Sequence, residues 1–235
     1  MREFPAPEAS NEGRGKEEKS RFSLWDSTTL LNKLTVAPMK RIALFGGAFD
    51  PPHIGHRGAI RSILAANAAS EVWLIPTGDR HDKTVRATAP QRVAMLEAFL
   101  QENFSNETRV RLDLCQVRGL IGGSYTIDLL RYFKSLHPDS SFLFVIGSDL
   151  IPQLPSWKEA DSLFQETEFL VLPRPGFSTS VPTNAKISIL SCEFLRPSSA
   201  SSSEARKLLG AEKATAEVLT PAVASYIEQH QLYRA

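Results

Sequence analysis

The chain has 235 residues, of which 42% are hydrophobic and 23% are charged, and its formal net charge is +1. These values are typical of a globular protein with a sizeable core, and they exclude a wholly disordered, collagen-like or coiled-coil chain. The balanced charge gives no sign of a nucleic-acid-binding surface, and no apolar stretch approaches the roughly 20 residues of a membrane-spanning helix.

Residues 1–38 combine acidic and basic side chains with Pro, Gly, Ser and Asn. They lack the uninterrupted apolar region of a signal peptide, and their many acidic residues are atypical of a transit peptide. We expect a flexible N-terminal extension, with targeting or partner binding as the alternative. We expect one domain over residues 39–235, with a helical C-terminal portion from about residue 197.

From residue 40 onward, short apolar runs alternate with segments of helical periodicity. The first run, KRIALFGG (40–47), ends in two glycines and is typical of a buried parallel strand. Helical spacing follows at Ile60, Ile63 and Leu64. The patterns predict strands over 40–47, 71–76, 109–115, 141–149, 168–176 and 186–190, and helices over 55–68, 90–103, 124–138, 157–166, 201–210 and 221–232.

This alternation predicts an α/β fold: a Rossmann-like, doubly wound, mostly parallel sheet with helices on both faces and a small C-terminal helical part. The cysteines Cys115 and Cys192 suit neither a disulfide framework nor a zinc motif. We therefore expect buried, reduced thiols in a cytoplasmic protein.

The first strand ends in GGAFDPPHIGH (46–56), where a sheet of this kind binds its ligands. The segment matches neither Gly-x-Gly-x-x-Gly nor the P-loop. Its glycines leave room for a ligand, and His53 and His56 come where a helix begins. Imidazole N–H groups and the free N–H groups of that helix could hold phosphate oxygens during nucleotidyl transfer. Spacing alone leaves two alternatives open: Asp50, His53 and His56 as metal ligands, or the histidines as helix caps.

GGAFDPPHIGH resembles the first signature of the HxGH nucleotidylyltransferases, and in particular that of the nicotinate/nicotinamide mononucleotide adenylyltransferases. Further segments resemble this family in its own order: GGSYTIDLL (122–130), FVIGSD (144–149), Trp157, LPRPG (172–176) and SSSEAR (201–206). The resemblance covers roughly residues 40–232. The loop PTGDRHDKT (76–84) departs from the Pro-Pro-His-Lys of many nicotinate-specific relatives, which leaves the choice between acid and amide substrate open.

The resemblance implies transfer of AMP from ATP to nicotinate or nicotinamide mononucleotide in NAD biosynthesis, with pyrophosphate as the second product. It implies Mg²⁺ carried mainly by the ATP phosphates, with no metal ligand on the protein, no nucleic acid and no membrane, and it allows a homo-oligomer. The implied catalytic residues are His53, His56, Lys83 and Arg206. The implied ATP-binding residues are Gly46, Gly47, Phe49, His53, His56, Gly147, Asp149, Ser201, Ser202, Ser203 and Arg206. The implied pyridine-nucleotide-binding residues are Ala48, Phe49, Lys83, Tyr125, Thr126, Trp157 and Arg174.

Several of these roles also have a chemical basis. The serines before the predicted helix at 201–210 could present donors to an anion, and Arg206 a planar fork. Trp157 could stack on the cationic pyridine ring. An N-cap, a solvated arginine and a core tryptophan are the alternatives. Another HxGH enzyme, of the pantetheine-phosphate adenylyltransferase or cytidylyltransferase type, and a non-catalytic nucleotide- or metal-binding module are the alternative functions.

Overall fold

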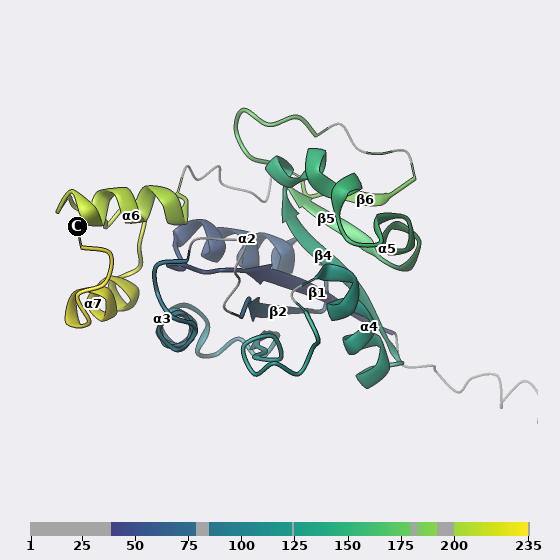
Figure 1. Ribbon diagram of the computed structural model, residues 1–235, viewed down its shortest axis with the longest axis horizontal. Helices are drawn as coiled ribbons and strands as arrows, with labels where there is room; N and C mark the ends of the chain where they lie inside the picture. Colours follow the sequence, from purple (N-terminus) through teal and green to yellow (C-terminus); the bar gives the residue numbers. More distant parts are fainter. Residues whose placement is uncertain are drawn as a thin grey trace, which may run out of the picture. The chain divides into compact units, whose positions relative to one another are not determined.

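The computed structural model describes residues 39–78, 85–123, 125–179, 182, 184–191 and 200–234. They form a six-stranded sheet in the order β3-β2-β1-β4-β5-β6, and every neighbouring pair is parallel (Figure 1). The predicted α/β fold is thereby confirmed. The strands are β1 (Lys40–Gly47), β2 (Glu71–Pro76), β3 (Val110–Leu112), β4 (Ser140–Gly147), β5 (Glu168–Leu172) and β6 (Lys186–Ile189).

Helices cover both faces of the sheet, because alternate strand residues point to opposite sides. Ala43, Val72 and Leu143 share one core with α2 (Ile54–Ala65), α3 (Ala89–Phe104) and the C-terminal helices. Those are α6 (Ser202–Gly210) and α7 (Pro221–Gln229). Ile42, Leu44 and Phe144 belong to the opposite core, with residues of α4 (Thr126–Leu136), the 3-10 segment η1 (Ser148–Ser156) and α5 (Ala160–Glu166).

The switch point of the sheet lies between β1 and β4. The chain moves outward from β1 to β3, then returns to the other side of β1 with β4. The ladder between β1 and β4 ends at Leu44 and Phe144, so Gly46, Gly47 and Gly147 are not paired across it. A crevice at the carboxyl ends of these two strands is where a doubly wound sheet binds its ligands.

Some predicted boundaries were wrong for identifiable reasons. The strand predicted over 109–115 shortens to β3, because the Asp113 carboxylate accepts the N–H of Cys115 and turns the chain. Residues 148–156 form 3-10 turns, since Pro152 and Pro155 lack the N–H that an α-helix needs. Cys115 is buried as expected, and Cys192 lies outside the described residues. No helix in the described part is long and apolar enough to cross a bilayer.

Candidate active site

His53 and His56 are locked into the turn between β1 and α2 by their own Nδ1 atoms. Nδ1 of His53 accepts the N–H of Gly55 at 3.1 Å, and Nδ1 of His56 accepts the N–H of His53 at 3.1 Å. A neutral imidazole whose Nδ1 accepts carries its proton on Nε2. Each ring therefore offers one Nε2–H donor, and no contact within the described residues engages it.

Both rings are neutral at physiological pH. Burial, and secondarily the charge of Arg174, lowers the pKa of His53 from 6.5 to about 3. Burial also holds the pKa of His56 well below 6.5, with smaller contributions from His53 and Arg174. The histidines serve as caps, one of the alternatives left open by the sequence, and the same geometry leaves their outer nitrogens as neutral donors.

The helix N-terminus itself is not a free anion site, contrary to the prediction. The N–H of Ile54 donates to the carbonyl of Val218 at 2.9 Å, and the N–H of His56 donates to the carbonyl of His53 at 2.9 Å. The N–H of Gly55 is taken by the His53 ring. Phosphate binding at this turn therefore depends on side chains rather than on unpaired backbone donors.

The Phe49 side chain packs against the turn that carries the histidines. Its φ of 51° lies in the left-handed region, which is uncommon for an aromatic residue, and its side chain is buried. The ring packs 4.9 Å from the His56 ring and lies beneath Gly47, where a Cβ would come within 3.3 Å of it. Phe49 thus shapes the site by packing, a role that its predicted nucleotide contacts did not include.

The Asp50 carboxylate is occupied by hydrogen bonds from the backbone. It is buried and accepts the backbone N–H groups of Arg86 at 2.8 Å and Ala87 at 3.0 Å. The described residues contain no group of three His, Cys, Asp or Glu side chains that could hold a metal ion. The metal-ligand alternative for Asp50, His53 and His56 is therefore not supported by the geometry.

The N-terminus of α6 docks on the same turn. The hydroxyl of Ser202 donates to the carbonyl of Pro51 at 2.8 Å, and the Arg206 guanidinium donates to the carbonyl of Asp50 at 2.6 Å. Ser201 caps α6 by accepting the N–H of Glu204, and Ser203 accepts from Arg206. Of the three serine hydroxyls only that of Ser202 donates within the described part of the chain, so a nucleotide phosphate would compete for Ser202, whereas Ser201 and Ser203 act as acceptors and keep their O–H donors.

Asp149 and Arg174 form an ion pair beside Gly147. Arg174 Nε lies 3.2 Å from Asp149 Oδ1, and the Arg174 N–H donates to the Ser148 hydroxyl at 2.9 Å. A Cβ on Gly147 would overlap Asp149 Oδ1 and Arg174 Nε, so any larger residue would have to displace these two side chains. Because the charge of Arg174 lowers the pKa values of both histidines, this pair belongs to the histidine side of the site.

A cavity of about 390 Å³ opens on the other side of the β1 end. Six predicted ligand-binding residues line it: Gly46, Gly47, Ala48, Tyr125, Thr126 and Trp157. Gln116, Gln153 and Lys158, which the sequence did not single out, also line it. The site thus combines this cavity, the aromatic compartment, which includes the glycines of β1, with the imidazoles of the neighbouring turn.

The aromatic compartment contains one cation and no carboxylate among its described lining residues. Trp157 packs edge-on against Phe169, with ring centroids 6.1 Å apart. The Lys158 ammonium lies 4.9 Å from the centre of the exposed Tyr125 ring and 3.0 Å from both carboxylate oxygens of Asp128. A flat ring that carries an anionic substituent would meet complementary chemistry here.

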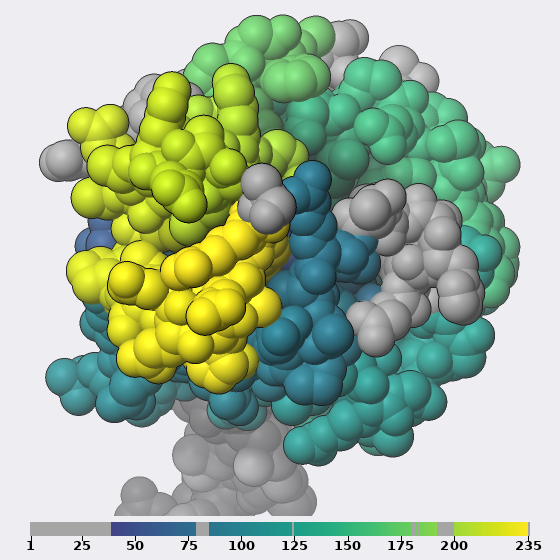
Figure 2. Space-filling view, turned by 60° about the vertical axis from the view of Figure 1, so that its left-hand side comes forward, coloured from purple at the N-terminus to yellow at the C-terminus, as the bar shows by residue number. Residues whose placement is uncertain are grey.

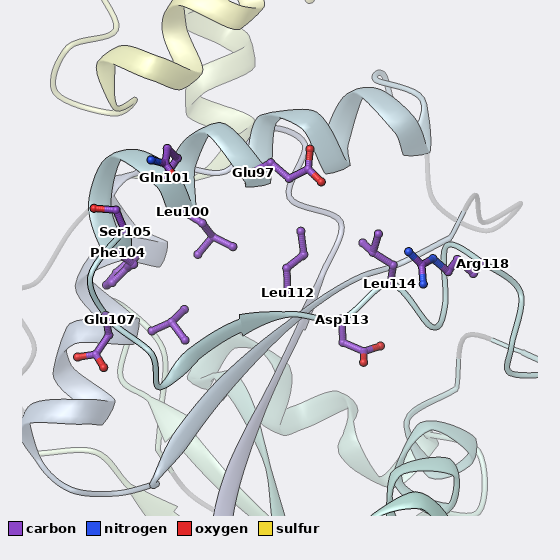
Figure 3. Close-up of a pocket in the computed structure, with 11 residues that line it drawn as sticks. Glu97, Leu100, Gln101, Phe104, Ser105, Glu107, Leu112, Asp113, Leu114 and Arg118 are labelled. Atoms are coloured by element: carbon purple, nitrogen blue, oxygen red, sulfur yellow. The ribbon is translucent and has the colours of Figure 1, made fainter.

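A second, larger hollow contains none of the predicted site residues. It measures about 620 Å³ and lies between α3 and β3 (Figure 3). Figure 3 shows Leu100 and Leu112 facing each other across it, with Glu97 and Asp113 beside them. Its rim, among the described residues, carries the carboxylates of Glu97, Glu107 and Asp113 against one cation, Arg118, which makes it poorly suited to phosphates.

The sequence missed Arg92, whose side chain is fully buried. Its guanidinium donates to the carbonyls of Ala48 at 2.8 Å, Ala87 at 3.2 Å and Gly78 at 3.4 Å. The sequence could have indicated this burial, because Arg92 precedes the apolar Met95 by three residues and so lies on the buried face of α3. Lys83 lies outside the described residues, between Gly78 and Ala87, so its predicted contacts stay a prediction.

Comparison with known proteins agrees with this geometry. Residues 44–208 match the family model described as "Cytidylyltransferase-like". The chain is 35% identical over 199 residues to the "Probable nicotinate-nucleotide adenylyltransferase" of Bacillus pumilus, covering 84% of this chain and 100% of that protein. It is 32% identical over 199 residues to the "Nicotinate-nucleotide adenylyltransferase" of Bacillus subtilis, with the same coverage of 84% and 100%.

The solved structures give the same result. The nicotinic acid mononucleotide adenylyltransferase of Plasmodium falciparum, solved in complex with NaAD, superposes with a TM-score of 0.68 and 28% sequence identity. The match covers 83% of this chain and 97% of that one. With its switch-point site, its paired histidines and these relatives, the chain belongs to the nicotinate-nucleotide adenylyltransferases of the cytidylyltransferase-like family.

Proposed function

We propose that this enzyme transfers AMP from ATP to nicotinate mononucleotide, forming deamido-NAD and pyrophosphate in NAD biosynthesis. The observation that carries the proposal is the aromatic compartment beside the histidine turn at the end of β1. The turn presents the Nε2–H donors of His53 and His56, and the compartment presents aromatic walls with Lys158 as the one cation among its described lining residues. This combination suits a triphosphate on one side and a pyridine carboxylate on the other.

In the proposed reaction a phosphate oxygen of the mononucleotide attacks the α-phosphorus of ATP. The bond from the α-phosphorus to the oxygen bridging to the β-phosphorus breaks, and pyrophosphate leaves with that oxygen and its electron pair. No covalent enzyme intermediate is needed, so catalysis consists of positioning and charge stabilisation. The Nε2–H groups of His53 and His56 donate to phosphate oxygens, as fixed neutral donors that need no proton transfer.

The remaining predicted residues keep the roles that the family resemblance implies. Arg206 would stabilise the departing pyrophosphate, together with Lys83, which lies outside the described residues, and Asp149 would accept from a ribose hydroxyl. Trp157, Tyr125 and Thr126 would enclose the pyridine ring. Arg174, predicted to bind the pyridine nucleotide, is better suited to the phosphate side, because it lies beside Asp149 and lowers the pKa values of the histidines.

Mg²⁺ fits this scheme as a companion of ATP. The described residues offer no cluster of three metal-ligating side chains, and Mg²⁺ commonly binds through substrate phosphates and water. When bound, it would neutralise charge on the phosphate oxygens. Assembly into a homo-oligomer and a cytoplasmic location stay predictions.

The test is pyrophosphate release from ATP and Mg²⁺ with nicotinate mononucleotide, nicotinamide mononucleotide or 4′-phosphopantetheine as the acceptor. We expect release with nicotinate mononucleotide and a lower kcat/KM for the amide. Release with 4′-phosphopantetheine alone would support the other HxGH chemistry and contradict the proposal. ATP binding without release from any acceptor would indicate a non-catalytic module.

A further inference from the structure

Tyr233 follows the last helix, α7, yet its hydroxyl contacts the turn that carries the histidines. The side chain is buried, with 6% of the residue exposed, and its hydroxyl donates to Asp50 Oδ1 at 2.6 Å. Its backbone φ of 62° lies in the left-handed region, which a bulky residue adopts when surrounding contacts hold it there. Figure 2 shows the yellow C-terminal residues lying against the blue surface that includes α3.

Each carboxylate oxygen of Asp50 has two polar partners. Oδ1 accepts from Tyr233 and from the N–H of Ala87 at 3.0 Å. Oδ2 accepts from the N–H of Arg86 at 2.8 Å and lies 3.7 Å from Arg206 Nη1. A buried carboxylate is stable only when such partners replace its lost hydration, so the loss of one donor affects the other three contacts.

These contacts connect three parts of the proposed phosphate site. Asp50 precedes His53 in the same turn, and its backbone carbonyl accepts from Arg206 at 2.6 Å. Arg86 and Ala87 follow the segment that contains Lys83. One carboxylate therefore fixes the histidine turn, the arginine of α6 and the chain just beyond Lys83 relative to one another.

We infer that Tyr233 is a positioning residue: its hydroxyl orients the Asp50 carboxylate and thereby sets the spacing of the groups that receive the ATP phosphates. The catalytic part of this inference rests on the proposed function, whereas the geometric part does not. Tyr233 is a dependable donor, because burial and the neighbouring Asp50 raise the pKa of its hydroxyl far above 10. The phenol therefore stays protonated at neutral pH.

The test uses Tyr233→Phe, which keeps the ring and removes the hydroxyl. We expect kcat to fall about tenfold, the usual order for one lost hydrogen bond to a charged group, with KM for nicotinate mononucleotide unchanged. Tyr226→Phe is the matched control, because it removes the same hydroxyl from a tyrosine of α7 whose ring stacks on His230 instead of approaching Asp50. That control should have wild-type kcat.

Hydrogen exchange of the backbone amides gives a readout that does not depend on activity. In Tyr233→Phe, the amides of Arg86 and Ala87 should exchange faster, while those of Ile42–Leu44 in β1 stay protected. Unchanged exchange at Arg86 and Ala87 would overturn the inference, whatever happens to kcat. Faster exchange with wild-type kcat would overturn its catalytic part. If the wild-type enzyme transfers no AMP, the proposed function fails, and the exchange result still decides the geometric part.

Discussion

The rings of His53 and His56 lie in close contact, with centroids 3.7 Å apart and planes tilted by 39°. Two protonated imidazoles at this separation would repel each other strongly. The pair is therefore compatible with two neutral rings, each with its inner nitrogen committed to the backbone. Capping and the proposed donation to phosphate use different atoms of the same side chains, so suitable substitutions should separate them.

His53→Asn is the substitution that separates them. Asparagine is an excellent N-cap residue, so its amide oxygen should accept the N–H of Gly55 while the Nε2–H donor is lost. We expect kcat to fall by about 10²- to 10³-fold, as on removal of one transition-state donor, with little change in melting temperature. His53→Ala, which loses the cap as well, should also lower the stability by about 1 kcal/mol. A His53→Asn enzyme with near-normal kcat would show that the ring is only a cap.

The histidines should also make the protein sensitive to acid. The pKa of His53 is about 3 in the folded protein, against 6.5 for an unperturbed histidine, so between these values the unfolded chain binds more protons. Its contribution to stability is complete above pH 6.5 and is lost as the pH falls from there toward 3, with a slope of up to about 1.4 kcal/mol per pH unit. Urea unfolding between pH 7.5 and 4 measures this slope.

His53→Asn serves as the control for that titration, because asparagine binds no proton. Its unfolding free energy should fall less steeply than that of the wild type over the same pH range, and the remaining slope would include His56. Equal slopes for the two proteins would mean that His53 titrates normally in the folded state.

Lys158 and Asp128 should have opposite effects on the choice between acid and amide. Removing the cation with Lys158→Met should lower the ratio of kcat/KM for nicotinate to nicotinamide mononucleotide by roughly three- to tenfold. Asp128→Asn frees the same ammonium from its partner and should raise that ratio. Lys134→Met removes an equal charge from a lysine paired with Glu166, and should leave the ratio unchanged. Parallel shifts in the first two variants would contradict an electrostatic origin.

Gly147→Ala should damage the site without touching the histidines. The new methyl group would overlap Asp149 and Arg174 and force their ion pair apart, so we expect a higher KM for ATP and a lower melting temperature. Gly58→Ala in α2 is the comparison, since a Cβ there meets nothing within 4 Å. That change should stabilise the protein by about 0.5–1 kcal/mol. Wild-type ATP kinetics in Gly147→Ala would show that the ion pair is dispensable.

The strands could be predicted well, because a strand that is buried on both faces consists of a nearly continuous run of apolar residues. The predicted bounds of the strands at 40–47 and 71–76 agree with the structure to the residue. Each is a short apolar run that ends in glycine or proline, a pattern typical of a buried parallel strand. Boundaries failed where a local side chain or proline intervened, as at Asp113 and in η1. These are single contacts, and periodicity does not encode them.

The sequence singled out candidate site residues where a short motif carries them and missed those that distant segments supply. The histidine turn was predicted from its own motif and Trp157 from the family resemblance, and Trp157 lines the cavity at the end of β1. Arg92 and Tyr233 were not, because their partners come from other segments, and Tyr233 meets Asp50 across 183 positions of sequence. The hydrogen bonds of the two Nδ1 atoms could not be predicted either, because the spacing of the histidines does not determine which ring nitrogen contacts the backbone.

Arg92 ties the described residues on both sides of the segment 79–84 to the end of β1. Its guanidinium cannot lose its proton and holds Gly78 and Ala87, the residues on either side of the segment 79–84, together with Ala48 at the end of β1. Substitutions or insertions between these two anchors would leave the anchors in place. Substitutions in DRHDKT other than at Lys83, which has a proposed role in the reaction, should therefore leave the histidine turn in position.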